Sequence, residues 1–215
     1  MPKKTFFHLP EEKQLRLLDA ASIEFSRTSL KEASIANIVR LAEIPRGSFY
    51  QYFEDKEDLY YYYFDLLRQD SKKNIEQAIK EAEGDLFEGI DNYFSKMIFE
   101  VLTGQHSRFY QNLFMNLDYY ATNRVSPHIT PNDRKSETCQ EKRDEYSIYR
   151  QIDLTKLTVY DEQEFKMLMQ MLMNIVFSSI TEGYRKLEEN SEYDIEEIIR
   201  HFKTKLNWLK KGACK

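Results

Sequence analysis

Apolar residues recur at intervals of three and four through most of the chain, which is the spacing of side chains on one face of a helix. No long stretch alternates valine or isoleucine with polar residues, as the strands of a half-buried sheet would. The chain has only six glycines and five prolines among 215 residues, so few helix breakers interrupt the pattern. We therefore predict an all-α fold.

Near the N-terminus the pattern predicts a group of three helices joined by short turns. Helices are expected over residues 11–27 and 35–41, the second with Ser34 as its N-cap. Residues 42–44 form a turn before a further short helix opens at Pro45, whose fixed φ suits a first helical position. The apolar face of the first helix is expected to contain Leu15, Leu18, Ala21 and Phe25. Two short helices joined in this way are a helix-turn-helix unit.

The helix that opens at Pro45 carries two kinds of side chain. Phe49 and Phe53 lie four residues apart and share its buried face. Gly47 leaves room for another backbone to approach closely. The remaining positions offer a cation, a hydroxyl group and phenols, from Arg46, Ser48, Tyr50 and Tyr52. This combination is typical of a recognition helix, and Asp55 then caps the helix that follows.

One gapless pattern runs through this region: Phe25, Ser34, Ile38, Ala42, Gly47, Phe49, Tyr50, Tyr52, Phe53 and Asp55 to Leu59. In these residues and their spacing the chain resembles the TetR family of bacterial transcriptional regulators. Two positions depart from the family. Glu43 stands in the turn where the family usually has glycine, and Pro45 stands where it has serine or threonine. A side chain at a left-handed turn position carries a modest strain.

The resemblance implies a helix-turn-helix DNA-binding domain over residues 1–56 and a helical effector-binding and dimerisation domain over residues 57–215. It implies a regulator, most often a repressor, that binds a palindromic double-stranded DNA operator as a homodimer and is released by a small effector. The residues expected to contact DNA are Ser34, Arg46, Gly47, Ser48, Tyr50, Tyr52 and Lys56. The polar groups expected to line a largely apolar effector site are Tyr93, Tyr110, Asn116 and Asn174.

The rest of the chain predicts further helices. We expect one long helix over residues 56–82, then helices over residues 86–102 and 109–117. Residues 119–135 have little periodicity and several turn-forming residues, so a long surface loop is expected there. Residues 136–151 are highly charged and are expected to form a marginal helix.

A late helix over residues 161–187 is apolar nearly all round, with Met167 and Met171 on the side opposite its main apolar face. Such a helix must be buried on both sides. With the last helix, over residues 195–209, it predicts a four-helix bundle between two chains; the alternative is that one monomer wraps both faces. A polar ribbon on this helix is expected to be buried and to bond within the fold, to a partner subunit or to a ligand: Gln170, Asn174, Ser178 and Thr181.

Charge changes this picture little. The formal net charge is −5, yet the first 56 residues carry nine Lys and Arg against eight Asp and Glu. Attraction to phosphate therefore depends on where the cations lie rather than on their number. Lys3 and Lys4 belong to an N-terminal arm, residues 1–10, which we expect to fray rather than to lie along DNA.

Enzymatic, metal-binding and membrane functions are not indicated. Cys139 and Cys214 are isolated thiols, which indicates a reducing cytoplasm, and the four histidines form no ligand set with them. No cofactor, catalytic residue or membrane span is expected. Two alternatives stay open. One is a DNA-tethered protein-interaction module on the same fold, with no effector and with residues 119–151 as its partner surface. The other is an enzyme hidden in the C-terminal body.

Overall fold

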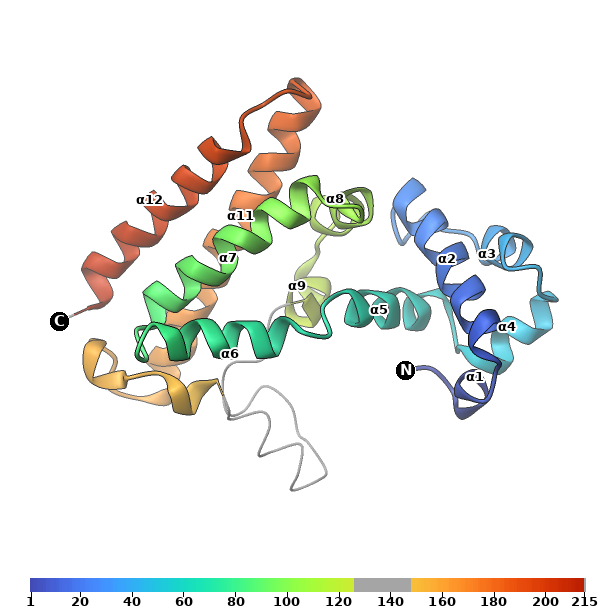
Figure 1. Cartoon of the computed structure of the whole chain (residues 1–215), viewed down its shortest axis with the longest axis horizontal. Coiled ribbons are helices and arrows are strands. Elements are labelled where there is room, and N and C mark those ends of the chain that lie inside the picture. The colour runs from blue at the N-terminus through green and yellow to red at the C-terminus, as the bar shows by residue number, and fades with distance from the viewer. Residues whose placement is uncertain (126–147, 215) are drawn as a thin grey trace. The chain divides into compact units, whose positions relative to one another are not determined.

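The computed structural model describes residues 1–125 and 148–214, and every regular element in these ranges is a helix (Figure 1). The predicted all-α fold is confirmed. The chain divides into two units. The first consists of Met1–Gln69 and Gln105–Asn116, and the second consists of Asp70–Gly104 and Leu117–Lys215.

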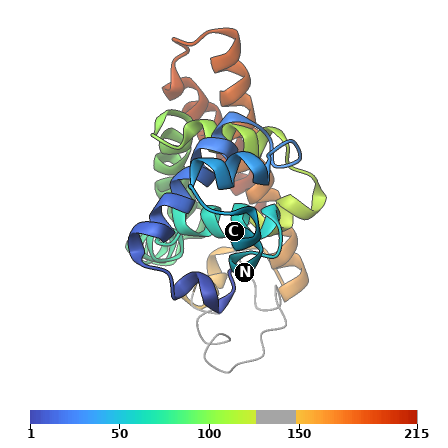
Figure 2. The ribbon, with the colours of Figure 1, turned by 90° about the vertical axis from the view of Figure 1, so that its right-hand side faces the viewer.

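The first unit joins the N-terminal helices to one helix from further along the chain. Its helices are α1 (Lys4–Phe7), α2 (Glu11–Arg27), α3 (Ile35–Leu41), α4 (Arg46–Tyr52), α5 (Lys56–Leu67) and α8 (Ser107–Met115). The blue helices α1 to α4 face the viewer in Figure 2. Phe25, Phe49 and Phe53 are fully buried in this unit. Phe25 packs edge-on against Tyr60, with ring centroids 4.8 Å apart.

The buried face of α2 is rotated from the one that the sequence predicts. Leu17 is buried, whereas Leu15 is 52% exposed. These two side chains point about 200° apart around the helix, because successive residues turn by about 100°. Ala21 and Phe25 are buried as expected, so the face is formed from positions 17, 21 and 25.

The N-terminal arm is ordered, and the expectation that it frays is wrong. Phe6 of α1 is fully buried. Its ring lies 5.1 Å from the ring of Phe53 and 5.5 Å from that of Tyr62, measured between centroids. Burial of a whole phenyl group outweighs the tendency of a chain terminus to disorder.

The second unit contains the longest helices of the chain. The helices of this unit are α6 (Ser71–Glu81), α7 (Leu86–Thr103), α9 (Tyr119–Val125), α11 (Glu162–Glu189) and α12 (Ile195–Ala213), with short 3₁₀ turns at Tyr149–Gln151 and Leu154–Lys156. Helices α7, α11 and α12 pack against one another (Figure 1). Gly183 permits this close approach, since a Cβ atom there would lie 2.5 Å from a methyl carbon of Leu102.

The single helix predicted over residues 56–82 is in fact two helices. Helix α5 ends at Leu67 and α6 begins at Ser71. No apolar residue stands between Leu67 and Ile75, so this stretch has no face that packing could hold straight. Arg68 instead turns back and pairs with Asp65 at 2.9 Å.

The predicted surface loop over residues 119–135 begins as a helix, α9. Asp118 explains the difference, because its carboxylate accepts a hydrogen bond from the backbone N–H of Ala121 at 2.8 Å. An aspartate in this position starts a helix even where apolar periodicity is weak. The rest of that loop and most of the charged segment 136–151 fall at residues 126–147, outside the described residues; Tyr149–Gln151 form a 3₁₀ turn.

Helix α11 begins one residue after the start of the predicted range 161–187 and ends two residues beyond it, and its main apolar face is buried. The polar ribbon is not buried in the single chain: Gln170, Asn174 and Ser178 are exposed. Ser178 and Thr181 donate to carbonyl groups of their own helix, at 3.0 and 2.9 Å. None of the helices in the described ranges has an apolar stretch sufficient to cross a bilayer.

Candidate nucleic-acid interface

The turn between α3 and α4 has the backbone that the sequence predicts. Glu43 adopts φ 56°, in the left-handed region where glycine is favoured. Its carboxylate reaches α2, where it accepts a hydrogen bond from Arg16 at 2.9 Å. This exposed pair contributes little free energy, but it fixes the direction in which the strained residue points.

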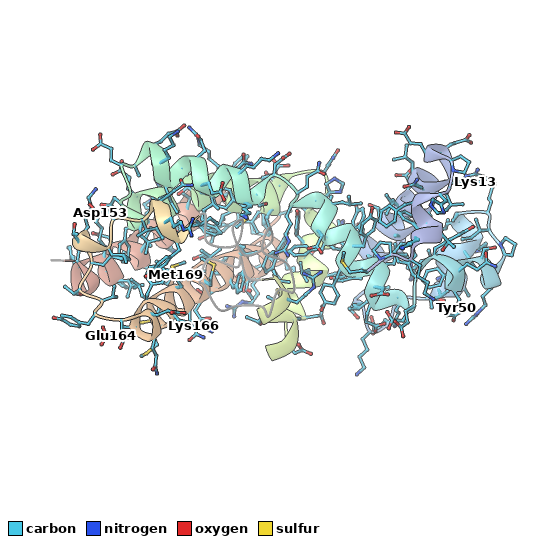
Figure 3. The ribbon with its side chains drawn as sticks, turned by 90° about the horizontal axis from the view of Figure 1, so that it is seen from below. Lys13, Tyr50, Asp153, Glu164, Lys166 and Met169 are labelled. Carbon is cyan, nitrogen blue, oxygen red and sulfur yellow. The ribbon has the colours of Figure 1, made fainter. Side chains whose placement is uncertain are left out.

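Helix α4 has one buried side and one open side. Phe49 is fully buried, whereas Arg46, Gly47 and Tyr50 are exposed. Tyr50 lies at the outer edge of the ribbon in Figure 3. A Cβ atom added to Gly47 would meet nothing within 4 Å, so the fold itself does not require glycine there. Only a molecule approaching from outside would benefit from the missing side chain.

The other predicted DNA contacts are half-buried. Ser34 stands at the N-cap of α3, although its side chain makes no capping hydrogen bond. Ser48 and Tyr52 lie at the margins of the open side of α4. Lys56 is engaged within the protein, because its ammonium group donates to the carbonyl oxygens of Lys31 at 2.7 Å and Ala33 at 3.1 Å. Pro45 is expected at the first helical position of α4, but it is the N-cap, and the helix begins one residue later, at Arg46.

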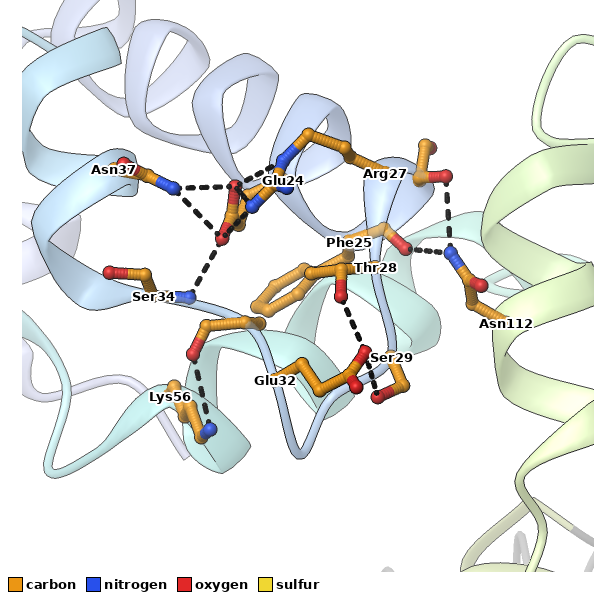
Figure 4. Close-up of polar contacts among 12 residues, drawn as sticks. Glu24, Phe25, Arg27, Thr28, Ser29, Glu32, Ser34, Asn37, Lys56 and Asn112 are labelled. Atoms are coloured by element: carbon orange, nitrogen blue, oxygen red, sulfur yellow. Dashed lines mark hydrogen bonds and ion pairs between the residues drawn. The ribbon is translucent and has the colours of Figure 1, made fainter.

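A buried carboxylate holds α3 in place, and the sequence patterns gave no signal of it. Glu24 on α2 is 1% exposed. It accepts a hydrogen bond from the backbone N–H of Ser34 at 2.7 Å and a bidentate pair of bonds from Arg27, from Nε to Oε2 at 3.1 Å and from Nη2 to Oε1 at 3.0 Å (Figure 4). The amide of Asn37 lies 3.4 Å from both carboxylate oxygens. The start of α3 is therefore tied to α2 by one ionised group.

The pKa of Glu24 reflects two opposed influences. Burial is the largest of them and raises the pKa, because the charged form loses its hydration. The hydrogen bonds from the backbone of Ser34 and from the side chains of Arg27 and Asn37 together outweigh it and bring the pKa below the usual value. Glu24 is therefore ionised at neutral pH.

Both ends of this architecture match known families. Residues 17–64 match the family described as "Bacterial regulatory proteins, tetR family". Residues 85–213 match the family described as "Tetracyclin repressor-like, C-terminal domain". The chain belongs to the TetR family. It is a DNA-binding transcriptional regulator, and the resemblance inferred from the sequence is confirmed. No curated protein matches by sequence.

Solved structures of other TetR-type regulators share the fold. SmeT, the repressor of the Stenotrophomonas maltophilia multidrug efflux pump SmeDEF, is 14% identical, with a TM-score of 0.62 over 95% of this chain and 93% of SmeT. A putative transcriptional regulator from Pseudomonas aeruginosa PAO1 is 15% identical, with a TM-score of 0.58 over 97% and 96%. FadR from Bacillus subtilis, solved with stearoyl-CoA, is 17% identical, with a TM-score of 0.53 over 92% and 98%. At these identities the likeness concerns the fold.

The predicted effector-binding residues of this TetR-family regulator are divided between the two units. Tyr110 and Asn116 belong to the first unit, and Tyr93 and Asn174 to the second. Tyr93 and Tyr110 are half-buried, whereas the two asparagines are exposed. Asn116 donates to the carbonyl oxygen of Asn112 in its own helix at 2.8 Å.

Asn112 joins α8 to α2, and no sequence pattern predicts this role. Its side-chain amide donates to the carbonyl oxygens of Phe25 at 2.9 Å and Ser26 at 3.1 Å (Figure 4). These carbonyls lie in the last turn of α2, where intrahelical partners are lacking. Helix α8 is thus bonded to the helix that carries Glu24. In the sequence Asn112 looks like any other polar residue, because only the fold brings it to α2.

Metal chemistry has no support in the part of the chain that the structure describes. Within residues 1–125 and 148–214, no group of three or more His, Cys, Asp or Glu side chains could hold a metal ion. Cys214 is half-buried, and burial raises the pKa of its thiol. A thiol in this state is a poor nucleophile.

Proposed function

We propose that this protein is a ligand-responsive repressor that binds a palindromic operator as a homodimer and leaves it when a small, largely apolar effector binds. The observation that carries the proposal is the asymmetry of α4. Its buried side is filled by Phe49, while Arg46, Gly47 and Tyr50 are open to a ligand. A helix of this kind enters the major groove of DNA with its open side toward the base edges.

Within this proposal each residue of the open side has a role. The guanidinium of Arg46 reads a guanine edge or clamps a phosphate group. Gly47 allows close approach, while Ser34, Ser48, Tyr50 and Tyr52 hold the DNA backbone. Lys56 is among the residues expected to contact DNA, but its bonds to two backbone carbonyls favour a different role, which is to fix the loop before α3. We therefore expect Lys56 to support the interface rather than to touch DNA.

A homodimer is supported by the apolar side chains that α11 and α12 leave exposed. Met167 is 55% exposed, Met171 is 52% exposed and Trp208 is 69% exposed. The exposed polar residues Gln170, Asn174 and Ser178 alternate with the two methionines along α11. Large apolar side chains gathered on one helix face are typical of an association surface. A second copy would bury them in a four-helix bundle, with half-sites about 34–36 Å apart on the operator.

Control by an effector is supported by the way α8 joins the first unit. Asn112 holds the last turn of α2, and α2 holds α3 through Glu24. A ligand that displaces α8 would therefore disturb the helix-turn-helix, provided that it binds the DNA-incompetent state more tightly. We keep Tyr93, Tyr110, Asn116 and Asn174 as proposed effector contacts. We propose an acyl chain or a planar drug as the effector class; stearoyl-CoA, with which FadR was solved, is an example of the first.

We further propose that residues 1–56 make the DNA contacts, that residues 57–215 provide dimerisation and effector binding, and that the protein works in the cytoplasm, where a bacterial operator lies. Residues 105–116 fold with the DNA-binding part although they belong to the second range. The boundary after residue 56 therefore separates the proposed roles of the two ranges, and it does not coincide with the boundary between the two packed units.

The test begins with a duplex that the purified protein selects from a randomised pool. Selected sequences should contain two inverted half-sites. Native mass spectrometry of the same preparation should reveal a co-purified apolar molecule, and adding that molecule should release the duplex in a fluorescence anisotropy titration. Selection of a single half-site would contradict the dimeric operator. A selected duplex that no co-purified or added apolar compound releases would contradict the effector.

A further inference from the structure

The C-terminal end of helix α4 is closed by the N-terminal arm of the chain. An α-helix leaves its last carbonyl groups without intrahelical partners. In α4 the carbonyls of Tyr50 and Tyr52 both accept from Lys3, the first from its ammonium group and the second from its backbone N–H, each at 2.8 Å. The carbonyl of Gln51, between them, accepts from the hydroxyl of Thr5. Three successive carbonyls are thus satisfied from a distant part of the sequence.

Helix α4 supplies no comparable stabilisation of its own. It has seven residues, no basic residue in its last turn, and an N-cap, Pro45, without a side-chain hydrogen bond. A helix this short does not persist on local interactions alone. The ammonium group of Lys3 also provides the positive charge that the C-terminal end of a helix dipole favours. The arm therefore contributes what the sequence of α4 lacks.

Phe6 anchors the arm in this position. Its buried ring packs against Phe53, the C-cap residue of α4, and against Tyr62 of α5. Lys3 and Thr5 lie within three residues of this anchor, so their donors are held close to the helix end. The side chain of Lys4 is exposed between them.

We propose that Lys3 and Thr5, anchored by Phe6, position the recognition helix for its operator. They are positioning residues: they set operator affinity and specificity through α4, without contact to a base. The inference rests on the proposed role of α4 as the recognition helix. It also distinguishes two uses of Lys3. A lysine that neutralises a phosphate changes the salt dependence of binding, whereas a lysine that orders a helix does not.

The experiment compares full-length Thr5→Val and Lys3→Met with the wild type and with Lys4→Met as a matched control. Thr5→Val removes one hydrogen-bond donor and no charge. Lys4→Met removes the same charge as Lys3→Met from the adjacent position. Affinity for the duplex selected by the wild type, and for an unrelated duplex, is measured by anisotropy at several salt concentrations. Thermal unfolding of each variant shows whether the fold is kept.

Thr5→Val and Lys3→Met should each weaken binding to the selected duplex by about threefold to tenfold. Their affinity for the unrelated duplex should stay unchanged, so the specificity ratio falls. The slope of log K against log salt should match the wild type in Thr5→Val and should not differ between Lys3→Met and Lys4→Met. A slope reduced by about one in Lys3→Met alone, with Thr5→Val at wild-type affinity, would assign Lys3 to a phosphate group and overturn the proposal. Wild-type affinity in both variants would overturn it as well.

Arg46→Ala separates this inference from the role of α4. If Arg46→Ala weakens operator binding and the two arm variants do not, only the positioning role fails. If Arg46→Ala has no effect on operator binding, the proposed recognition role of α4 is contradicted, and with it the premise of the positioning role.

Discussion

The carboxylate of Glu24 accepts a hydrogen bond from the backbone N–H of Ser34 at 2.7 Å, and this bond joins the end of α2 to the beginning of α3. Because Glu24 is buried, it bonds to the helix-turn-helix as an ionised group that solvent cannot replace. The orientation of the DNA-binding helices thus depends on one charge inside the fold.

Glu24→Gln should destabilise the protein at neutral pH by about 1–3 kcal/mol, because the charge-assisted bonds from Arg27 and Ser34 weaken. The pKa of Glu24 is lower in the folded state than in the unfolded chain. Its ionisation therefore stabilises the fold above the unfolded pKa, and the contribution is lost as the pH falls through the folded value. Urea unfolding of both proteins at pH 7 and near pH 3 measures this: the difference should shrink in acid. Glu32→Gln, a change of the same kind at an exposed position, is the control. An equal difference at both pH values would contradict the assignment.

Arg46→Ala should weaken operator binding by about 1–3 kcal/mol while unfolding stays unchanged, since Arg46 is exposed and contributes nothing to the buried core around Phe49. An anisotropy titration at fixed salt measures the affinity. Lys73→Ala removes an equal charge from an exposed position on α6 and should bind normally. Equal affinities of Arg46→Ala and the wild type would remove Arg46 from the interface.

Helix starts that follow an aspartate are a part of this fold that the sequence predicts well. Asp55, Asp85 and Asp161 each accept a hydrogen bond from the backbone N–H three residues later, and the helices begin where these residues stand. This chemistry is local, so a short stretch of sequence contains all of it. The open side of α4 follows from local spacing in the same way, because Phe49 defines the buried side.

The features that could not be predicted from the sequence depend on contacts between residues that are distant along the chain. Lys3 meets α4 some 47 residues away, and Asn112 meets the end of α2 some 87 residues away. Neither contact leaves a pattern in its own stretch of chain. The break between α5 and α6 differs from the prediction for a local reason: residues 68–74 are all polar, so no apolar face continues from one helix to the next.

Met171→Glu should convert a homodimer to a monomer. A carboxylate in place of a half-exposed thioether would be buried at the proposed interface without a partner. Obligate interfaces of this kind usually bury more than about 2,000 Å². Sedimentation velocity at micromolar concentration distinguishes the two states. Tyr160→Glu, at a residue 86% exposed and outside the proposed interface, should leave the dimer intact. A wild-type protein that sediments as a folded monomer would contradict the assembly itself.

Asn112→Ala should impair release of DNA by the effector without weakening binding of the effector. The variant loses both bonds to the end of α2, so movement of α8 is no longer passed to the helix that carries Glu24. Calorimetry of the effector and an anisotropy release titration separate the two quantities. Release that follows the wild-type curve would show that α8 is not the route.

Asn116→Ala and Asn174→Ala test the effector site and should behave differently from Asn112→Ala. If these amides bond to the effector, each variant should need about tenfold more of it for release, with operator affinity unchanged. Loss of dimerisation in Asn174→Ala would instead assign this exposed amide to the subunit interface. A normal response in both variants would place the effector elsewhere.

The unit that contains the helix-turn-helix is not one continuous piece of chain. Phe109 of α8 is fully buried, with its ring centroid 5.1 Å from those of Tyr60 and Tyr63. In a fragment that ends at residue 69, these tyrosines would be exposed and the hydrogen bonds from Asn112 to the end of α2 would be lost. A chimera that transfers only the N-terminal segment to another body must therefore supply a substitute for α8. The segment after residue 69 therefore contributes to operator preference through α8. An exchange of this segment between relatives is expected to alter DNA binding even where the residues of α4 are kept.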